Sequence, residues 1–101
     1  MTDERWFSLT LFEQLSNISG DVKRFIDARE AYSAGREKED YSGFYFDRIV
    51  EYVNKTLDDP KNKGREAELL DEVGEIDRYI KGEVPKDYIM TYWDQFTWAI
   101  S

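Results

Sequence analysis

The densest group of side chains that could take part in chemistry is a run of four carboxylates, Glu68, Asp71, Glu72 and Glu75. Their spacing of three and four residues would place them along one exposed stripe of a helix. Like charges at this spacing repel by about 0.2–0.5 kcal/mol per pair, and a basic partner would relieve that repulsion. The stripe is therefore either a binding surface for a basic protein or a solvated face that Arg78 partly neutralises.

Three cations precede the acidic stripe, at Lys61, Lys63 and Arg65. Cations beside the exposed amides of a helix N-terminus can form an anion pocket. The glycine spacing is not that of a phosphate loop, however, and Glu66 and Glu68 follow immediately. The pattern is thus compatible with a weak anion contact and with simple pairing to neighbouring carboxylates.

A third candidate surface lies near the end of the sequence, where Met90, Asp94 and Trp98 fall off the apolar face of the last predicted helix. Tryptophan is enriched in the residues that dominate protein interfaces. We therefore predict a partly exposed aromatic patch for partner binding, with the alternative that Trp98 covers one end of the core. Three tyrosines could extend the exposed aromatic surface: Tyr41, Tyr45 and Tyr88.

The chain contains no histidine and no cysteine. A serine nucleophile would lack its usual base, a thiol nucleophile is absent, and a di-iron helical site could not be completed. A calcium loop beginning at Asp59 would put Lys61 and Lys63 where carboxylates are needed. We predict no catalytic residue, no cofactor and no metal site. An enzyme or small-ligand binder that uses carboxylates with Mg²⁺ is the third-ranked hypothesis.

Composition narrows the class of protein. The chain has 101 residues, of which 41% are hydrophobic and 36% charged, as expected for one globular domain. A net charge of −8 repels phosphate backbones, so we expect basic protein partners and no direct binding of nucleic acid. No apolar run is long enough to cross a membrane, and the first residues lack a signal pattern. A cytoplasmic location is the resulting expectation.

Four amphipathic segments must position these side chains. Apolar residues recur every three or four positions within about residues 10–34, 44–58, 63–81 and 86–100. Thr10 and Glu13 have the spacing of a capping box at the first start. Asp59 or Asn62 would cap the third helix, and Gly82 suits the position after its end.

Each apolar stripe covers one side of its helix, so the helices must pack together. Short connections favour antiparallel neighbours, and we predict an all-α, single-domain, up-down antiparallel four-helix bundle over residues 1–101. Trp6 and Phe7 would fold back over one end. Arg29 interrupts the first apolar stripe, so it would either reach solvent or pair with Asp77 or Glu66.

Several residues resemble the pattern of a known group of proteins. They are Trp6, Leu9, Leu11, the run Glu13-Gln14-Leu15, Asn17-Ile18, the run Asp59-Pro60-Lys61-Asn62, Gly64-Arg65 and Tyr92-Trp93. In this order they resemble uncharacterised small prokaryotic helical proteins of about 100 residues. The resemblance implies a compact helical fold and carries no activity. The chain departs from the pattern in a shorter linker with Pro85 and in Asp94, where an aromatic residue is usual.

These observations favour a small acidic, non-catalytic helical module for protein–protein interaction or regulation. Its partner would be another protein or a second copy of the chain in a homodimer. The alternative is an acidic inhibitor or antitoxin-like protein, whose carboxylate stripe would block a basic nucleic-acid-binding surface.

Overall fold

The longest helix of the chain, α2, spans Leu11–Ser33 and begins at the predicted capping box. In the computed structural model, which describes residues 1–96, the Thr10 hydroxyl accepts a hydrogen bond from the Glu13 amide at 3.1 Å. The Thr10 amide donates to the Glu13 carboxylate at 3.0 Å. The two bonds satisfy amides that the first helical turn would leave unpaired. The predicted start of this helix is therefore confirmed.

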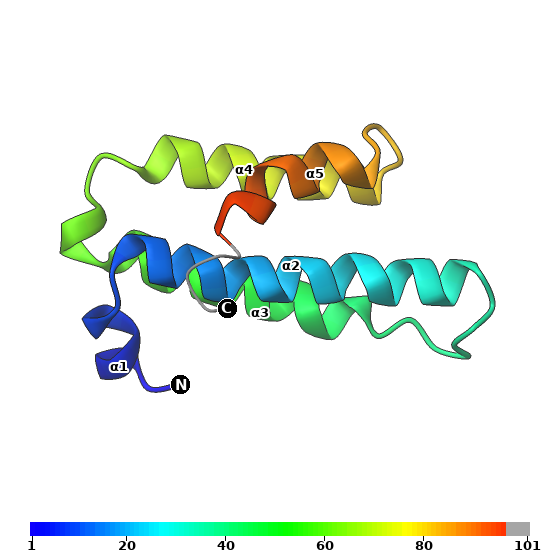
Figure 1. The fold of residues 1–101 in the computed structure, drawn as a ribbon, viewed down its shortest axis with the longest axis horizontal. Coiled ribbons are helices and arrows are strands. Elements are labelled where there is room, and N and C mark those ends of the chain that lie inside the picture. The colour runs from blue at the N-terminus through cyan, green and yellow to red at the C-terminus, as the bar shows by residue number, and fades with distance from the viewer. Residues whose placement is uncertain (97–101) are drawn as a thin grey trace.

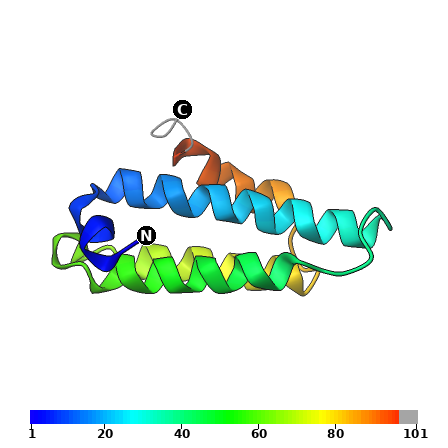
Figure 2. The same cartoon turned by 90° about the horizontal axis from the view of Figure 1, so that it is seen from below.

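Helix α3 spans Ser42–Asp58 and runs back along α2 in the opposite direction (Figure 1). A view turned by 90° shows the same two helices lying side by side over most of their length (Figure 2). The apolar stripes predicted from the sequence face each other here. Their buried members include Val22 and Phe25 from α2, and Ile49 and Val53 from α3.

The remaining two long segments form a second antiparallel pair beside the first (Figure 1). Helix α4 spans Glu66–Ile80 and contacts α3, whereas α5 spans Lys86–Trp93 and contacts both α2 and α4. Leu69, Ile76 and Ile89 are buried in the shared core. The contact between α4 and α5 positions the candidate site.

The turn between α4 and α5 explains how the chain reverses there. Gly82 has a φ of 78°, a left-handed conformation that favours glycine. Its amide donates to the carbonyl of Tyr79 at 3.0 Å, and the Glu83 amide donates to that of Arg78 at 2.9 Å. This pair of bonds closes the end of α4 as a Schellman motif. The predicted role of Gly82 is confirmed.

An additional helix, α1, spans Asp3–Ser8 and lies across one end of the α2–α3 pair (Figure 2). The sequence pattern predicts no helix over these residues. Trp6 is only 1% exposed, but Phe7 is 40% exposed. The expectation that both would cover the core is thus right for Trp6 and wrong for Phe7, because adjacent helical residues point in different directions.

The predicted start of the third helix is wrong by three residues. A short 3₁₀ helix, η1, spans Pro60–Asn62, and α4 begins only at Glu66, after a turn in which Gly64 has a φ of 96°. Asp59 caps η1, and its side chain accepts from the Lys61 amide. Asn62 is buried and does not cap α4, which has no side-chain cap.

The last predicted helix is also shorter than residues 86–100. Helix α5 ends at Trp93, and residues 94–96 form a tighter turn. The Ser16 hydroxyl of α2 donates to the carbonyl of Phe96, which ties this turn to α2. Residues 97–101, including Trp98, lie outside the described part of the chain.

Within residues 1–96 the fold has five α-helices, short 3₁₀ segments at residues 60–62 and 94–96, and no strand. The predicted all-α class is confirmed, while the number of α-helices exceeds the expected four. A radius of gyration of 13.8 Å is close to the ~13 Å of a compact chain of this length. None of the helices in the described residues combines the length and apolar character needed to cross a membrane.

Arg29 has a different partner from those predicted. Its guanidinium donates to the carbonyl of Ile80 at 3.4 Å and lies 5.5 Å from the ring centre of Tyr79. Asp77 instead pairs with Lys81, and Glu66 accepts from the Gly64 amide. A backbone carbonyl and an aromatic face therefore stabilise this half-buried cation in place of a carboxylate.

Candidate functional site

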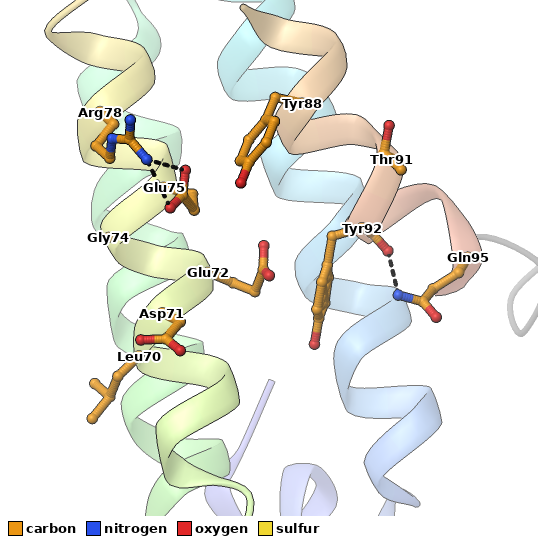
Figure 3. Close-up of a pocket in the computed structure, with 10 residues that line it drawn as sticks. All are labelled: Leu70, Asp71, Glu72, Gly74, Glu75, Arg78, Tyr88, Thr91, Tyr92 and Gln95. Carbon is orange, nitrogen blue, oxygen red and sulfur yellow. Dashed lines mark hydrogen bonds and ion pairs between the residues drawn. The ribbon is translucent and has the colours of Figure 1, made fainter. Parts of the chain in front are cut away.

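The acidic stripe of α4 faces two tyrosines of α5. Glu68, Glu72 and Glu75 follow a spacing of four and three residues, so they share one side of α4. Tyr88 and Tyr92 are four residues apart and share one side of α5. Since the Gly82 turn brings the two helices together, two of these carboxylates, Glu72 and Glu75, line one side of a groove and the two rings line the other (Figure 3).

This α4–α5 groove has a volume of about 800 Å³. Leu70 and Tyr88, both on its lining, are each 55% exposed, so the groove opens to solvent. Figure 3 shows Tyr88 and Tyr92 extending from α5 towards α4, and Glu72 extending the other way. The complete lining is Leu70, Asp71, Glu72, Gly74, Glu75, Arg78, Tyr88, Thr91, Tyr92 and Gln95.

Hydrogen bonds and ion pairs fix both ends of the groove. At one end the Tyr92 hydroxyl donates to Glu68 at 3.0 Å, and Arg65 donates to the same carboxylate at 2.7 and 2.9 Å. At the other end Arg78 lies 3.2 Å from Glu75 and 3.3 Å from Glu83. Burial is the main cause that raises the pKa of Tyr92 above its ordinary value. The hydrogen bond to Glu68 and the negative charge of Glu68 add to the effect. Tyr92 is therefore a neutral donor at physiological pH.

The middle of the groove carries charge without compensation. Asp71 and Glu72 have no hydrogen bond or ion pair to any other residue of the described range 1–96. Partial burial raises the pKa of Glu72 from 4.5 to about 7, and the negative charges of Glu75, Glu68 and Asp71 add to the effect. Glu72 thus changes charge near neutral pH, which makes it the most electrostatically perturbed carboxylate of this surface.

The raised pKa of Glu72 predicts a pH-dependent stability. Between about pH 4.5 and 7 the folded chain keeps a proton on Glu72 that the unfolded chain releases, so this residue's contribution to stability falls as pH rises through that window. Replacing Glu72 with Gln removes this titration. We expect E72Q to raise the free energy of unfolding by about 1 kcal/mol near pH 8, after allowance for solvent screening, and to leave it unchanged near pH 4. Urea unfolding at the two pH values measures both changes, and an equal shift at both would contradict the assignment.

Two of the three cations predicted to contact an anion are engaged by carboxylates of the chain itself. Lys61 pairs with Asp59 and also donates to the carbonyl of Phe7 at 3.1 Å. Arg65 is engaged by Glu68, and Lys63 is exposed. Two of the three cations therefore already have acidic partners, which weakens the attraction of this turn for an anion.

Met90 and Asp94 do not join the acidic stripe. They line a separate depression of about 220 Å³ between α2 and α5, on another face of α5 from Tyr88 and Tyr92. Met90 is half-buried there and Asp94 is exposed. The predicted partner-binding residues thus belong to two surfaces, and Trp98 lies outside the described residues.

Sequence reasoning missed the importance of Leu70 and Tyr92 for this surface. In the sequence, Leu70 lies at the edge of the apolar stripe predicted for residues 63–81, and Tyr92 widens the stripe predicted for residues 86–100. The signal that could have found the tyrosine wall is the four-residue spacing of Tyr88 and Tyr92. The spacing does not show which residues lie opposite the two tyrosines, because the packing of α4 against α5 depends on contacts between distant residues.

Within residues 1–96 there is no group of three or more acidic side chains that could hold a metal ion. No protein-family model matches the chain, and neither a curated protein nor a solved structure is similar to it beyond chance. The resemblance to small prokaryotic helical proteins stays a prediction. The site is therefore interpreted from its own geometry.

Proposed function

We propose that this chain is a non-catalytic, cytoplasmic protein-interaction module, built as an up-down four-helix bundle with α1 added, and that it binds a partner protein in the α4–α5 groove. The observation that carries the proposal is the exposure of two large apolar side chains, Leu70 and Tyr88, along a groove of about 800 Å³. Exposed aromatic and aliphatic side chains around a concave surface are typical of sites where partner residues anchor.

Affinity capture from the native host tests the proposal when wild type is compared with two variants. Tyr88→Ala removes a 55% exposed ring from the groove, whereas Tyr41→Ala removes a 52% exposed ring from the start of α3. We expect a protein that is retained by wild type and by Y41A but is at least about tenfold depleted with Y88A, because truncating an interface anchor costs more than 1 kcal/mol. Equal retention by all three proteins would contradict a role for the groove.

A second candidate function is inhibition of a nucleic-acid-binding protein. The favouring observation is the pair Asp71 and Glu72, whose carboxylates have no cationic partner within the described residues. These groups would stand in for phosphates on a basic surface. In that case the captured partner should bind DNA or RNA and release it when this chain is added. A captured partner that does not bind nucleic acid would reject this second function and leave the protein-interaction module as the proposed function.

A further inference from the structure

We infer that the occupant of the α4–α5 groove is an arginine-bearing amphipathic helix of the partner protein. This inference rests on the function proposed above and adds the chemistry of the bound segment. Three observations on the groove support it: its charge, its shape, and the position of two tyrosine rings across the groove from the Glu72 carboxylate.

Charge selects a cationic segment. Three carboxylates line the groove, Asp71, Glu72 and Glu75, against the single guanidinium of Arg78. Arg78 is already held between Glu75 and Glu83, and the ion pairs at the groove ends do not reach Asp71 or Glu72. A bound cation would therefore meet two uncompensated carboxylates, the exposed Asp71 and the half-buried Glu72, and its attraction to Glu72 is stronger than at an open surface.

Shape selects a helix. The groove lies between two antiparallel helices and includes lining residues from Leu70 to Arg78, which corresponds to about 12 Å along α4 at 1.5 Å per residue. A helix of about two turns fits such a length, and helices commonly lay an apolar stripe into a groove between two others. Leu70 and Tyr88 supply apolar surface for that stripe.

The placement of Tyr88 and Tyr92 across the groove from Glu72 favours arginine over lysine in the bound segment. A guanidinium is planar, so it can stack on a tyrosine ring while its edge donates two hydrogen bonds to a carboxylate. The stick view shows Tyr88 extending from α5 towards α4, the Tyr92 ring lying along the space between the helices, and Glu72 extending towards α5 (Figure 3). An ammonium group has no flat face and would use only part of this arrangement.

A bound guanidinium would also favour the ionised form of Glu72, so binding should strengthen as the pH rises. The pKa of Glu72 in the unbound chain is about 7, and the gain is therefore expected between about pH 6 and 8. The charged and titratable groups lining the groove around Glu72 are Asp71, Glu75 and Arg78 from α4, with Glu68 beside them, and Tyr88 and Tyr92 from α5.

The probe for this inference is a fluorescein-labelled synthetic peptide of about 14 residues with leucine and arginine at helical spacing. Matched peptides carry lysine or glutamate in place of every arginine. Fluorescence anisotropy near pH 8 compares wild type with Glu72→Gln and Tyr88→Ala. The control variants are Glu37→Gln and Tyr41→Ala, which alter an exposed carboxylate and an exposed ring away from the groove.

We expect E72Q to weaken binding of the arginine peptide about tenfold and Y88A about fivefold, because they remove a charge-assisted hydrogen bond and a stacking face. The two control variants should stay within about twofold of wild type. The lysine peptide should bind several-fold more weakly, and the glutamate peptide should not bind. For wild type, affinity should rise between about pH 6 and 8, and this rise should be absent in E72Q.

Five results would overturn the inference. Equal losses in groove and control variants would show only general attraction to a chain of net charge −8. Equal affinity for the arginine and lysine peptides would remove the selection for guanidinium. Sedimentation that shows a wild-type dimer dissociated by Y88A would make a second copy the occupant. If the arginine peptide fails to bind while the captured partner still depends on Tyr88, this occupant is rejected and the proposed function stands. If neither peptide binding nor partner capture depends on Tyr88, the inference and the proposed function are both rejected.

Discussion

Replacing Trp6 with alanine is expected to lower the free energy of unfolding by about 3–5 kcal/mol, the range for truncating a large buried aromatic side chain. Trp6 is 1% exposed, its ring centre lies 4.6 Å from that of Tyr52, and its indole nitrogen donates to the Thr56 hydroxyl at 3.2 Å. The substitution would leave a cavity between α1 and α3 that the neighbouring helices cannot fill by small shifts. Urea unfolding followed by far-ultraviolet circular dichroism measures the loss.

The matched control is the adjacent aromatic residue on the same helix. Phe7 is 40% exposed, and Phe7→Ala is expected to change the free energy of unfolding by less than about 1 kcal/mol. Similar effects of the two substitutions would contradict the packing of α1 described here. A loss below about 1 kcal/mol for Trp6→Ala would show that α1 does not contribute to the core.

Replacing Asn62 with alanine is expected to lower the free energy of unfolding by about 1–3 kcal/mol, because it leaves the buried side-chain oxygen of Gln14 without its donor. The Asn62 amide donates to the Gln14 side-chain oxygen and to the Thr56 carbonyl, each at 2.9 Å. Asn62 is buried, as are Gln14 and Thr56, so water cannot replace the lost bonds without opening this end of the fold.

Lys63→Ala is the control for Asn62→Ala. Lys63 follows Asn62 directly but is exposed, and its removal should change the free energy of unfolding by no more than about 0.5 kcal/mol. Thermal and urea unfolding of both variants give the comparison. An Asn62→Ala variant as stable as Lys63→Ala would mean that the buried hydrogen bonds of this turn do not hold the helices together.

The reason for these large effects is a buried polar network that joins four segments. Gln14 of α2 donates to the carbonyl of Trp6 at 2.9 Å and to the carboxylate of Asp59 at 3.0 Å. Burial opposes the charge of Asp59, but hydrogen bonds from Lys61 and Gln14 outweigh it and keep the pKa of Asp59 below its ordinary value. The network fixes α1, the end of α3 and η1 against α2, and it therefore sets the place from which α4 begins.

The local features of this fold could be predicted because they depend on neighbouring residues. The spacing of Leu15, Ile18 and Val22 indicates one apolar side of a helix, and all three are buried. The Thr10 capping box and the Gly82 turn also follow from short-range chemistry. The helix over Asp3–Ser8 was missed because six residues are too few to show a period.

The sequence by itself determined that the chain is helical, which sides of its long helices are apolar, and that acidic residues share one side of α4. Only the tertiary structure decided that Tyr88 and Tyr92 form the opposite wall of a groove and that Glu72 is partly withdrawn from water. The physical reason is that periodicity records the burial of each helix separately, whereas the pairing of helix faces depends on contacts between distant residues. The charge of Glu72 near neutral pH is thus a product of the packing of α5 against α4.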